Sequence, residues 1–380
     1  MSDRIQKIVT RLPDLKSVTK VWDMAERRLD QGDVAFVADL GIALADRYGS
    51  SAAQVWQYRS VFDRLLRLLT TTSGQECVEQ ALRLVSATSP GNRKMARYAA
   101  SLLADGQNAK DLAIPFAGGS SRAAASEELR ACLVQELVLR SVTIAESPAI
   151  EAWATSPHWS HHPFAWLPLE LSVIEETPPL PSYSVGGASY SMPYGPQDGP
   201  GVALGGSTSL PQATETTTEG FSAAAAAAVA NWAEESNGRS EAGTYELAEP
   251  VEAEILPGLL AALGLECLSG VGPRNRFALS VCRPEHAWRM LFAAASTGGA
   301  YNNGVYGAYG RLAAWRSLTA LSGASTTAPV GEVERYIQEC DWYSFGAATK
   351  WFERVAWDIG LVSVVPGARR IAVLAATDTD

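Results

Sequence analysis

The sequence predicts an α+β protein in which an all-α N-terminal domain of helical hairpins precedes a domain with a small mixed or antiparallel sheet. Three observations predict this class. Apolar residues recur at helical spacing over residues 17–145, residues 151–212 are rich in proline, glycine and aromatic residues, and strand-like segments appear mainly after residue 240. We therefore expect a helical domain at 1–150, an irregular linker or excursion at 151–212, and an α+β domain at 213–380.

The N-terminal helices are predicted from apolar spacings of three and four that glycine and proline interrupt. These breaks fall at Gly32, Gly49, Gly74 and the Pro90-Gly91 pair. A Val-Trp pair begins at Val21 and again at Val55, 34 residues later, which is the period of a tetratricopeptide repeat. The second unit lacks the small residues of the first, so the sequence predicts a helical-hairpin array and leaves open whether it is a true repeat.

The middle segment is predicted to be irregular, because its density of proline and glycine cannot sustain a helix or an inner strand. One strand is expected near Leu169–Glu175. After it, the expected elements alternate. We predict a helix over 221–236, strands over 243–249, 265–268 and 277–282, helices over 284–296, 310–322, 330–340 and 350–358, and two closing strands over 361–365 and 371–377. The last strand is apolar on both faces, which predicts a position inside the sheet.

Charge is concentrated in one region. Residues 151–260 contain 14 acidic side chains and one basic side chain, whereas the regions on either side are nearly neutral. This balance disfavours a nucleic-acid partner, which requires a basic surface. A basic protein partner fits the charge, and so does the simpler interpretation that the acidic residues solvate long loops.

The remaining composition favours a soluble cytoplasmic protein. The chain has no apolar run long enough to span a bilayer and no secretory signal, so no membrane association is expected. Its five cysteines are an odd number without CxxC spacing, which is typical of free thiols in a reducing compartment. No cofactor is implied.

The stretch "TGGAYNNGVYGAYGRLAAWRS" at 297–317 is the first candidate site. Its glycines precede a helix, as in a phosphate loop, but the Lys-Ser pair of such a loop is missing. Two other interpretations are open: close helix packing, or a pocket in which two arginines meet an anion. The pocket would use Tyr301, Asn303, Tyr306, Tyr309, Arg311 and Arg316.

Three weaker candidates remain. Cys282 ends a predicted strand and His286 lies four residues on, so a nucleophilic thiol at a helix N-terminus is one hypothesis and a buried strand cysteine the other. The run "PHWSHHPFAW" offers His158, His161 and His162 as metal ligands, although no metal site is expected without a complete ligand pattern. Asp378 and Asp380 follow the last strand, where a cation site or a solvated tail is expected.

Three segments, "NWAEESNGR", "GGAYNNGVYGAYGRLAAWRSLTALSG" and "WFERVAWDIGLVSVVPGARRIAVLAATDTD", resemble an uncharacterised actinobacterial family known as a domain of unknown function. The resemblance covers about residues 220–380. It implies a bacterial, cytosolic protein and transfers no functional residue. With no GxSxG or GxGxxG motif, the sequence favours a protein-interaction module, immunity-like in kind, that binds a basic protein. The alternative is an enzyme or small-anion receptor with its site around residues 298–311.

Overall fold

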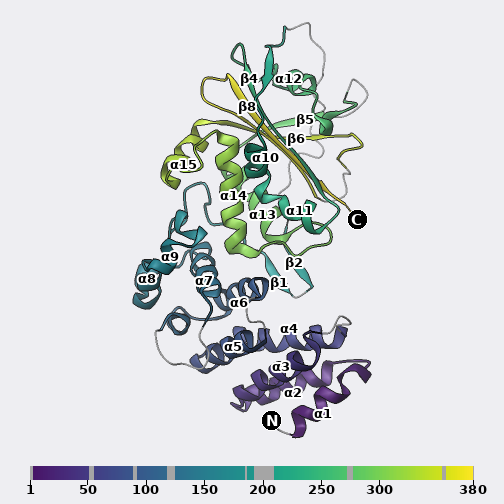
Figure 1. Cartoon of the computed structure of the whole chain (residues 1–380), viewed down its shortest axis with the longest axis vertical. Coiled ribbons are helices and arrows are strands. Elements are labelled where there is room, and N and C mark those ends of the chain that lie inside the picture. The colour runs from purple at the N-terminus through teal and green to yellow at the C-terminus, as the bar shows by residue number, and fades with distance from the viewer. Residues whose placement is uncertain are drawn as a thin grey trace. The chain divides into compact units, whose positions relative to one another are not determined.

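The α+β class is confirmed by the computed structural model of the chain, which describes residues 3–50, 55–88, 92–117, 125–184, 186–191, 209–271, 277–352 and 357–379. The chain divides into two compact units (Figure 1). Unit 1 comprises Met1–Ala165 with Tyr183–Gly187, and unit 2 comprises Trp166–Ser182 with Ala188–Asp380. No helix among the described residues is long and apolar enough to cross a bilayer.

Helices build unit 1. They are α1 (Asp3–Arg11), α2 (Thr19–Asp30), α3 (Val34–Tyr48), α4 (Trp56–Thr71), α5 (Gln75–Thr88), α6 (Arg93–Gly106), α7 (Glu127–Leu139), α8 (Pro148–Ala154) and α9 (Pro157–Ser160), with the short 3₁₀ turns η1 (Leu12–Asp14), η2 (Asp111–Phe116), η3 (Ile144–Glu146) and η4 (Pro163–Trp166). The caps follow the sequence, since the Asn92 and Ser126 side chains accept the amide N–H groups that open α6 and α7. Ten of the 13 residues of α7 are buried, and two of these, Gln135 and Glu136, are polar.

The two Val-Trp pairs do not occupy equivalent helix positions. Trp22 lies in the fourth position of α2, whereas Val55 is the N-cap of α4 and Trp56 its first residue. The 34-residue spacing is therefore not the spacing between corresponding helices, and the array lacks the register of a tetratricopeptide repeat.

Unit 2 is built on a six-stranded antiparallel sheet with the order β3-β4-β8-β7-β6-β5. Its strands are β3 (Ala213–Glu215), β4 (Arg239–Leu247), β5 (Phe277–Cys282), β6 (Asp341–Ala347), β7 (Trp357–Val364) and β8 (Arg370–Asp378). A small two-stranded sheet is formed by β1 (Ser182–Ser184) and β2 (Gly187–Ser189). The interior position predicted for the last strand is confirmed, because β8 pairs with β4 on one side and β7 on the other.

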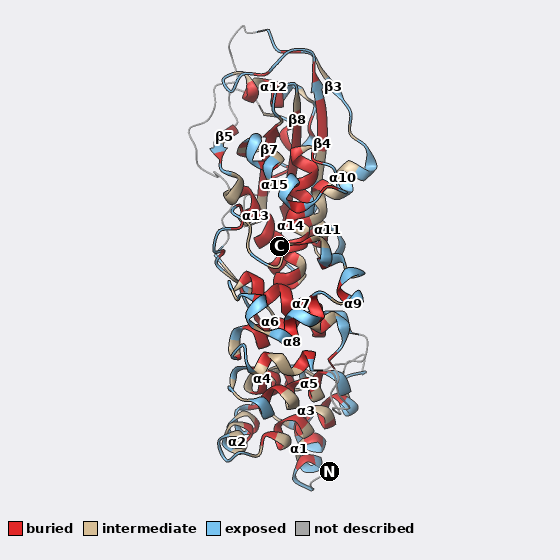
Figure 2. Ribbon diagram, turned by 90° about the vertical axis from the view of Figure 1, so that its left-hand side faces the viewer, coloured by how far each residue is buried: buried red, intermediate tan, exposed pale blue. Residues whose placement is uncertain are grey.

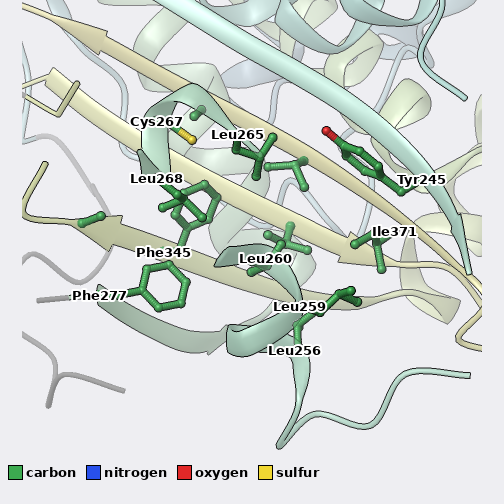
Figure 3. Close-up of a cluster of buried hydrophobic side chains, with 14 of the residues drawn as sticks. Tyr245, Leu256, Leu259, Leu260, Leu265, Cys267, Leu268, Phe277, Phe345 and Ile371 are labelled. Atoms are coloured by element: carbon green, nitrogen blue, oxygen red, sulfur yellow. The ribbon is translucent and has the colours of Figure 1, made fainter. Parts of the chain in front are cut away.

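Helices cover both faces of this sheet. The helical elements are α10 (Glu219–Ala225), η5 (Ala226–Ala228), α11 (Ala230–Glu235), α12 (Leu256–Ala262), η6 (Glu266–Leu268), α13 (Pro284–Thr297), α14 (Tyr306–Ser322) and α15 (Val330–Glu339). On β7, Ser363 donates to a carbonyl of α14 at 2.6 Å, while Val362 and Val364 on the opposite face belong to an apolar cluster. Figure 3 shows this cluster with its members from α12 and η6, among them Leu256, Leu260 and Leu268. Since both faces are covered, β8 is buried along nearly its whole length, and α14 is buried along most of its length (Figure 2).

Four predicted elements differ from the structure. Residues 169–175 form a turn closed by Ser172 and Glu175, and residues 265–268 form η6, because Glu241 accepts the N–H groups of Glu266 and Cys267. The helix expected over 221–236 is interrupted by η5, where the Ala228 N–H donates to a serine of α14 instead of its own helix. Within 350–358, the described residues form no helix, and β7 begins at residue 357.

Candidate functional site

The glycine-rich loop 298–305 joins α13 to α14 and binds the protein's own acceptors. Three successive backbone N–H groups, those of residues 299–301, donate to Asn302 Oδ1 at 2.8 Å, Asp378 Oδ2 at 2.7 Å and Ser236 Oγ at 3.2 Å. A phosphate loop would direct such amides at its ligand. Here a carboxylate of the chain takes that place, so the loop has the geometry of a structural anchor.

Asp378 anchors this loop from the end of β8. Its side chain is buried and accepts N–H groups from Ala300 and Thr379. Gly299 permits the contact, because a Cβ at that position would overlap the Asp378 carboxylate. The structure thus places Asp378 in a backbone-binding role, while Asp380 lies outside the described residues.

Arg311, predicted to meet an anion, meets one from its own chain. It is fully buried on α14 and forms a bidentate ion pair with the fully buried Glu175, at 2.6 Å from Nε and 2.7 Å from Nη2. It also donates to the carbonyl oxygens of Pro168 and Glu170, while Trp315 Nε1 donates to Glu175 at 2.8 Å. The guanidinium therefore clamps the segment before residue 176 onto α14.

Arg316 is not brought together with Arg311. It is exposed, and five residues of α-helix rotate its direction by about 140° from that of Arg311. The other predicted side chains of this stretch differ in burial: Tyr301 is exposed, Asn303 and Tyr309 are partly buried, and Tyr306 is buried at the first position of α14 with a φ of 66°. The stretch serves mainly the packing of α13 against α14.

Cys282 and His286 lie on either side of the β5–α13 junction. The Cys282 thiol contacts the carbonyl oxygen of Arg283 at 3.4 Å, and burial raises its pKa to about 12. Burial, followed by the nearby charges of Arg289 and Arg283, lowers the pKa of His286. A nucleophilic pair requires a thiolate, and this environment favours the neutral thiol.

The three clustered histidines make separate local contacts. His158 Nδ1 lies 2.6 Å from Glu127, His161 Nδ1 lies 2.7 Å from the carbonyl oxygen of Pro157, and His162 accepts the Phe164 N–H at Nδ1 while its Nε2 lies 3.6 Å from Glu128. Among the described residues, no three His, Cys, Asp or Glu side chains are grouped so as to hold a metal ion.

The acidic residues of the middle region form the most distinctive surface of unit 2. We define the acidic rim as five exposed glutamates on β3, on β4 and on the segment that leads from β4 to α12: Glu215, Glu246, Glu249, Glu252 and Glu254. None of them forms an ion pair with a described residue. In unit 1, by contrast, many carboxylates pair with arginines: Glu26, Asp39, Asp63, Glu128 and Glu136.

Two arginines near the rim are engaged elsewhere. Arg370 lies opposite Glu246 in the β4–β8 register, but its Nε donates to Thr244 Oγ1 at 3.1 Å. Arg369 donates to the carbonyl oxygen of Ala248. The rim therefore keeps a net negative charge at its end of the sheet.

The rim includes an edge strand. The Thr216 N–H donates to Thr244 O at 2.9 Å, so the even-numbered residues of 212–216 direct their backbone groups to β4. Backbone direction alternates along an antiparallel strand, which turns the N–H and C=O groups of Ala213 and Glu215 to the other side. We call these four groups the open edge, since β3 ends the strand order of the described sheet.

An exposed apolar residue lies close to the open edge. The Leu210 side chain is 40% exposed and lies three residues before β3, near α12. Sequence reasoning found the excess of acidic residues but missed β3, because a three-residue strand gives no periodic signal. The combination of charge, backbone donors and acceptors, and apolar surface is typical of a site that receives an extended chain.

Comparison with known proteins gives one family match. A family model described as a family of unknown function, DUF6183, matches residues 19–380. The match confirms the expected domain of unknown function and extends it through the helical unit. No curated protein and no solved structure matches the chain.

Proposed function

The chain belongs to DUF6183, and because the description of that family names no activity, we propose from the geometry that it is a protein-binding protein whose β3 edge receives a basic extended segment of a partner. The observation that carries the proposal is the position of Glu215, an exposed carboxylate that forms no ion pair with a described residue and lies on a strand with an open edge. A partner strand would form main-chain hydrogen bonds with the open edge, and a cationic side chain of the partner would pair with Glu215.

Electrostatics supports a basic partner over an acidic or neutral one. Glu215 on β3 and Glu246 on β4 are exposed and form no ion pair with a described residue. A cationic segment is therefore attracted to this pair of strands before contact, and orientations that turn its positive charges away are disfavoured. Leu210 supplies apolar area beside the edge. An immunity-like protein, which acts by binding a basic protein, is one role that such a surface suits.

The proposal includes a cytosolic location in a bacterium. Its support is the resemblance to an actinobacterial family and the five cysteines, which are all unpaired thiols in the structure. The alternative of an anion receptor at residues 298–311 is less favoured, since Arg311 and the loop amides already bind Glu175 and Asp378.

The experiment uses two seven-residue peptides as probes, one alternating Lys with Val and one alternating Glu with Val. Fluorescence anisotropy is measured with the full chain at low and at physiological salt. We expect the Lys/Val peptide to bind and to lose affinity as salt rises, because the rim charges are exposed and are screened. Equal binding of both peptides, or binding of neither, would overturn the proposal.

Variants separate the charge from the edge. Glu215→Gln should weaken binding roughly 1.5- to 5-fold, as expected for one cross-strand charge pair. Ala213→Pro removes an N–H that faces away from β4, so the β3–β4 ladder remains and binding should fall roughly two- to tenfold. Glu332→Gln, at an exposed position of α15 away from the rim, is the matched control and should leave binding unchanged.

A further inference from the structure

Two arginines at the start of α13 face the same carboxylate without reaching hydrogen-bond distance. Arg283 Nη2 lies 3.9 Å from Glu176 Oε1, and Arg289 Nη2 lies 3.8 Å from Glu176 Oε2. Charge-assisted N–H···O bonds are about 2.7–2.9 Å long. Glu176 therefore places one negative charge between two guanidinium groups without a charge-assisted hydrogen bond to either.

The guanidinium donors have few other acceptors. Among the described residues, the Arg283 side chain makes no hydrogen bond, and its Nε lies 3.8 Å from Glu285 Oε2. Arg289 uses only Nε, in a 3.4 Å bond to the Glu285 carbonyl oxygen. Both Nη atoms of each arginine are thus available to an oxyanion that approaches between them.

The surroundings of the two arginines carry charges of both signs. α13 is 14 residues long, and no side chain caps its N-terminus, so its dipole is directed to the same region. The positive charges of Arg289 and Arg283 contribute to lowering the pKa of His286, and that of Arg289 opposes the rise of the Tyr190 pKa. Glu285, whose carboxylate lies 3.8 Å from Arg283 Nε, opposes this effect, and its charge contributes to raising the pKa of Cys282.

Glu176 is held in place by its neighbour in the chain. Glu175 is fixed by the buried pair with Arg311, and Glu176 follows it with a φ of 50°, in a region that non-glycine residues rarely adopt. The position of Glu176 therefore follows from the clamp before it and does not require strong bonds of its own carboxylate, which is 43% exposed. A stronger anion can displace the side chain without moving the backbone.

We propose that Arg283 and Arg289 form a binding site for a phosphate group, which Glu176 fills when no phosphate is bound. A phosphate carries up to twice the charge of a carboxylate and three strong acceptor oxygens, and arginine forks bind it bidentately. The site accepts free inorganic phosphate or the phosphate of a small monoester. It lies at α13, apart from the acidic rim, and does not depend on the proposed peptide edge.

Isothermal titration calorimetry with inorganic phosphate, in buffer kept at constant ionic strength with chloride, tests the site on the full chain. Wild type should bind, and Glu176→Gln should bind about three- to tenfold more tightly, because the competing charge is removed. The double variant R283Q/R289Q should lose at least about tenfold. Arg335→Gln, at an exposed arginine of α15, is the control and should match wild type.

Opposite effects of the two kinds of variant distinguish a binding site from a structural ion pair, in which every substitution would only destabilise the protein. Glycerol 3-phosphate is titrated in parallel, and tighter binding than that of inorganic phosphate identifies a monoester as the ligand. Equal phosphate affinity in wild type, Glu176→Gln and the double variant would overturn the proposal. So would the absence of binding to both wild type and Glu176→Gln at a phosphate concentration of roughly 10 mM, ten times the dissociation constant of about 1 mM that is typical of weak anion sites. Because Glu176→Gln keeps both arginines, this result stands even where the double variant fails to fold.

Discussion

Replacing Arg311 with methionine should lower the unfolding free energy of unit 2 by about 3–5 kcal/mol, the loss measured when one partner of a buried ion pair is removed. Methionine keeps much of the side-chain length but leaves the Glu175 charge buried, with Trp315 Nε1 and the Ser172 N–H as its remaining donors. The carbonyl oxygens of Pro168 and Glu170 lose their donors as well, and each orphaned acceptor costs about 1–3 kcal/mol at most.

The double variant E175M/R311M refines this prediction. With both charges absent, its loss should be smaller than the sum of the two single losses, by a coupling energy of about 1–3 kcal/mol. Part of the loss remains, because Trp315 Nε1 and the two carbonyl oxygens still lack partners. A coupling energy of this sign assigns that part of the loss in unfolding free energy to the ion pair, and the loss that remains in the double variant to the surrounding hydrogen bonds.

The assay is urea denaturation monitored by the hydrogen exchange of residues 166–176, since exchange reports on unit 2 separately from unit 1. Faster exchange in this segment and in α14 is expected for Arg311→Met at low urea. A change in unfolding free energy below about 0.5 kcal/mol, typical of surface substitutions, would refute the reasoning that the pair is buried and structural.

Two further predictions concern close packing and burial. Gly299→Ala should lower the free energy of unfolding by about 1–3 kcal/mol, because its Cβ displaces Asp378. Gly331→Ala is the control and should be neutral or stabilising, because a Cβ there meets nothing within 4 Å. The urea midpoints of the two variants are compared, and equal effects would contradict the packing argument. Burial raises the pKa of both Cys282 and Cys340 from 9.0 to about 12, so the folded state favours the thiols. Their contribution to stability is complete below pH 9 and is lost as the pH rises through 12, so the urea midpoint should fall between pH 8 and pH 10.5. At pH 8, native protein should react slowly with a thiol reagent and urea-unfolded protein rapidly; rapid native reaction would count against the burial of these thiols.

The sequence predicted those features that local pattern determines. Pro284 at the first turn identified α13, and the continuous apolar run of 371–377 identified an interior strand. The strand expected at 265–268 was wrong because the carboxylate of Glu241, distant in sequence, caps this segment as a 3₁₀ turn. Apolar composition alone could not distinguish the two.

The partner of Arg311 could not be predicted, since Glu175 is 136 residues away and follows an irregular segment. Without that partner, an arginine after a glycine-rich loop is compatible with an anion site as well as with close helix packing, and the sequence left both interpretations open. The charge of the acidic rim was visible in composition, but its position at a sheet edge depends on the pairing of β3 with β4. Such long-range pairing leaves no local trace.

The central position of β8 affects how unit 2 assembles as the chain is made. β4 forms its inner pairing with a strand that lies more than 120 residues later, and in the described sheet this strand, β8, joins β5, β6 and β7 to the β3–β4 pair. Until residues 370–378 have left the ribosome, the inner edge of β4 has no partner and the two halves of the sheet are separate. Closing so long a segment is slow, and an unpaired strand edge favours aggregation, so unit 2 is most exposed to misassembly before its last strand is made.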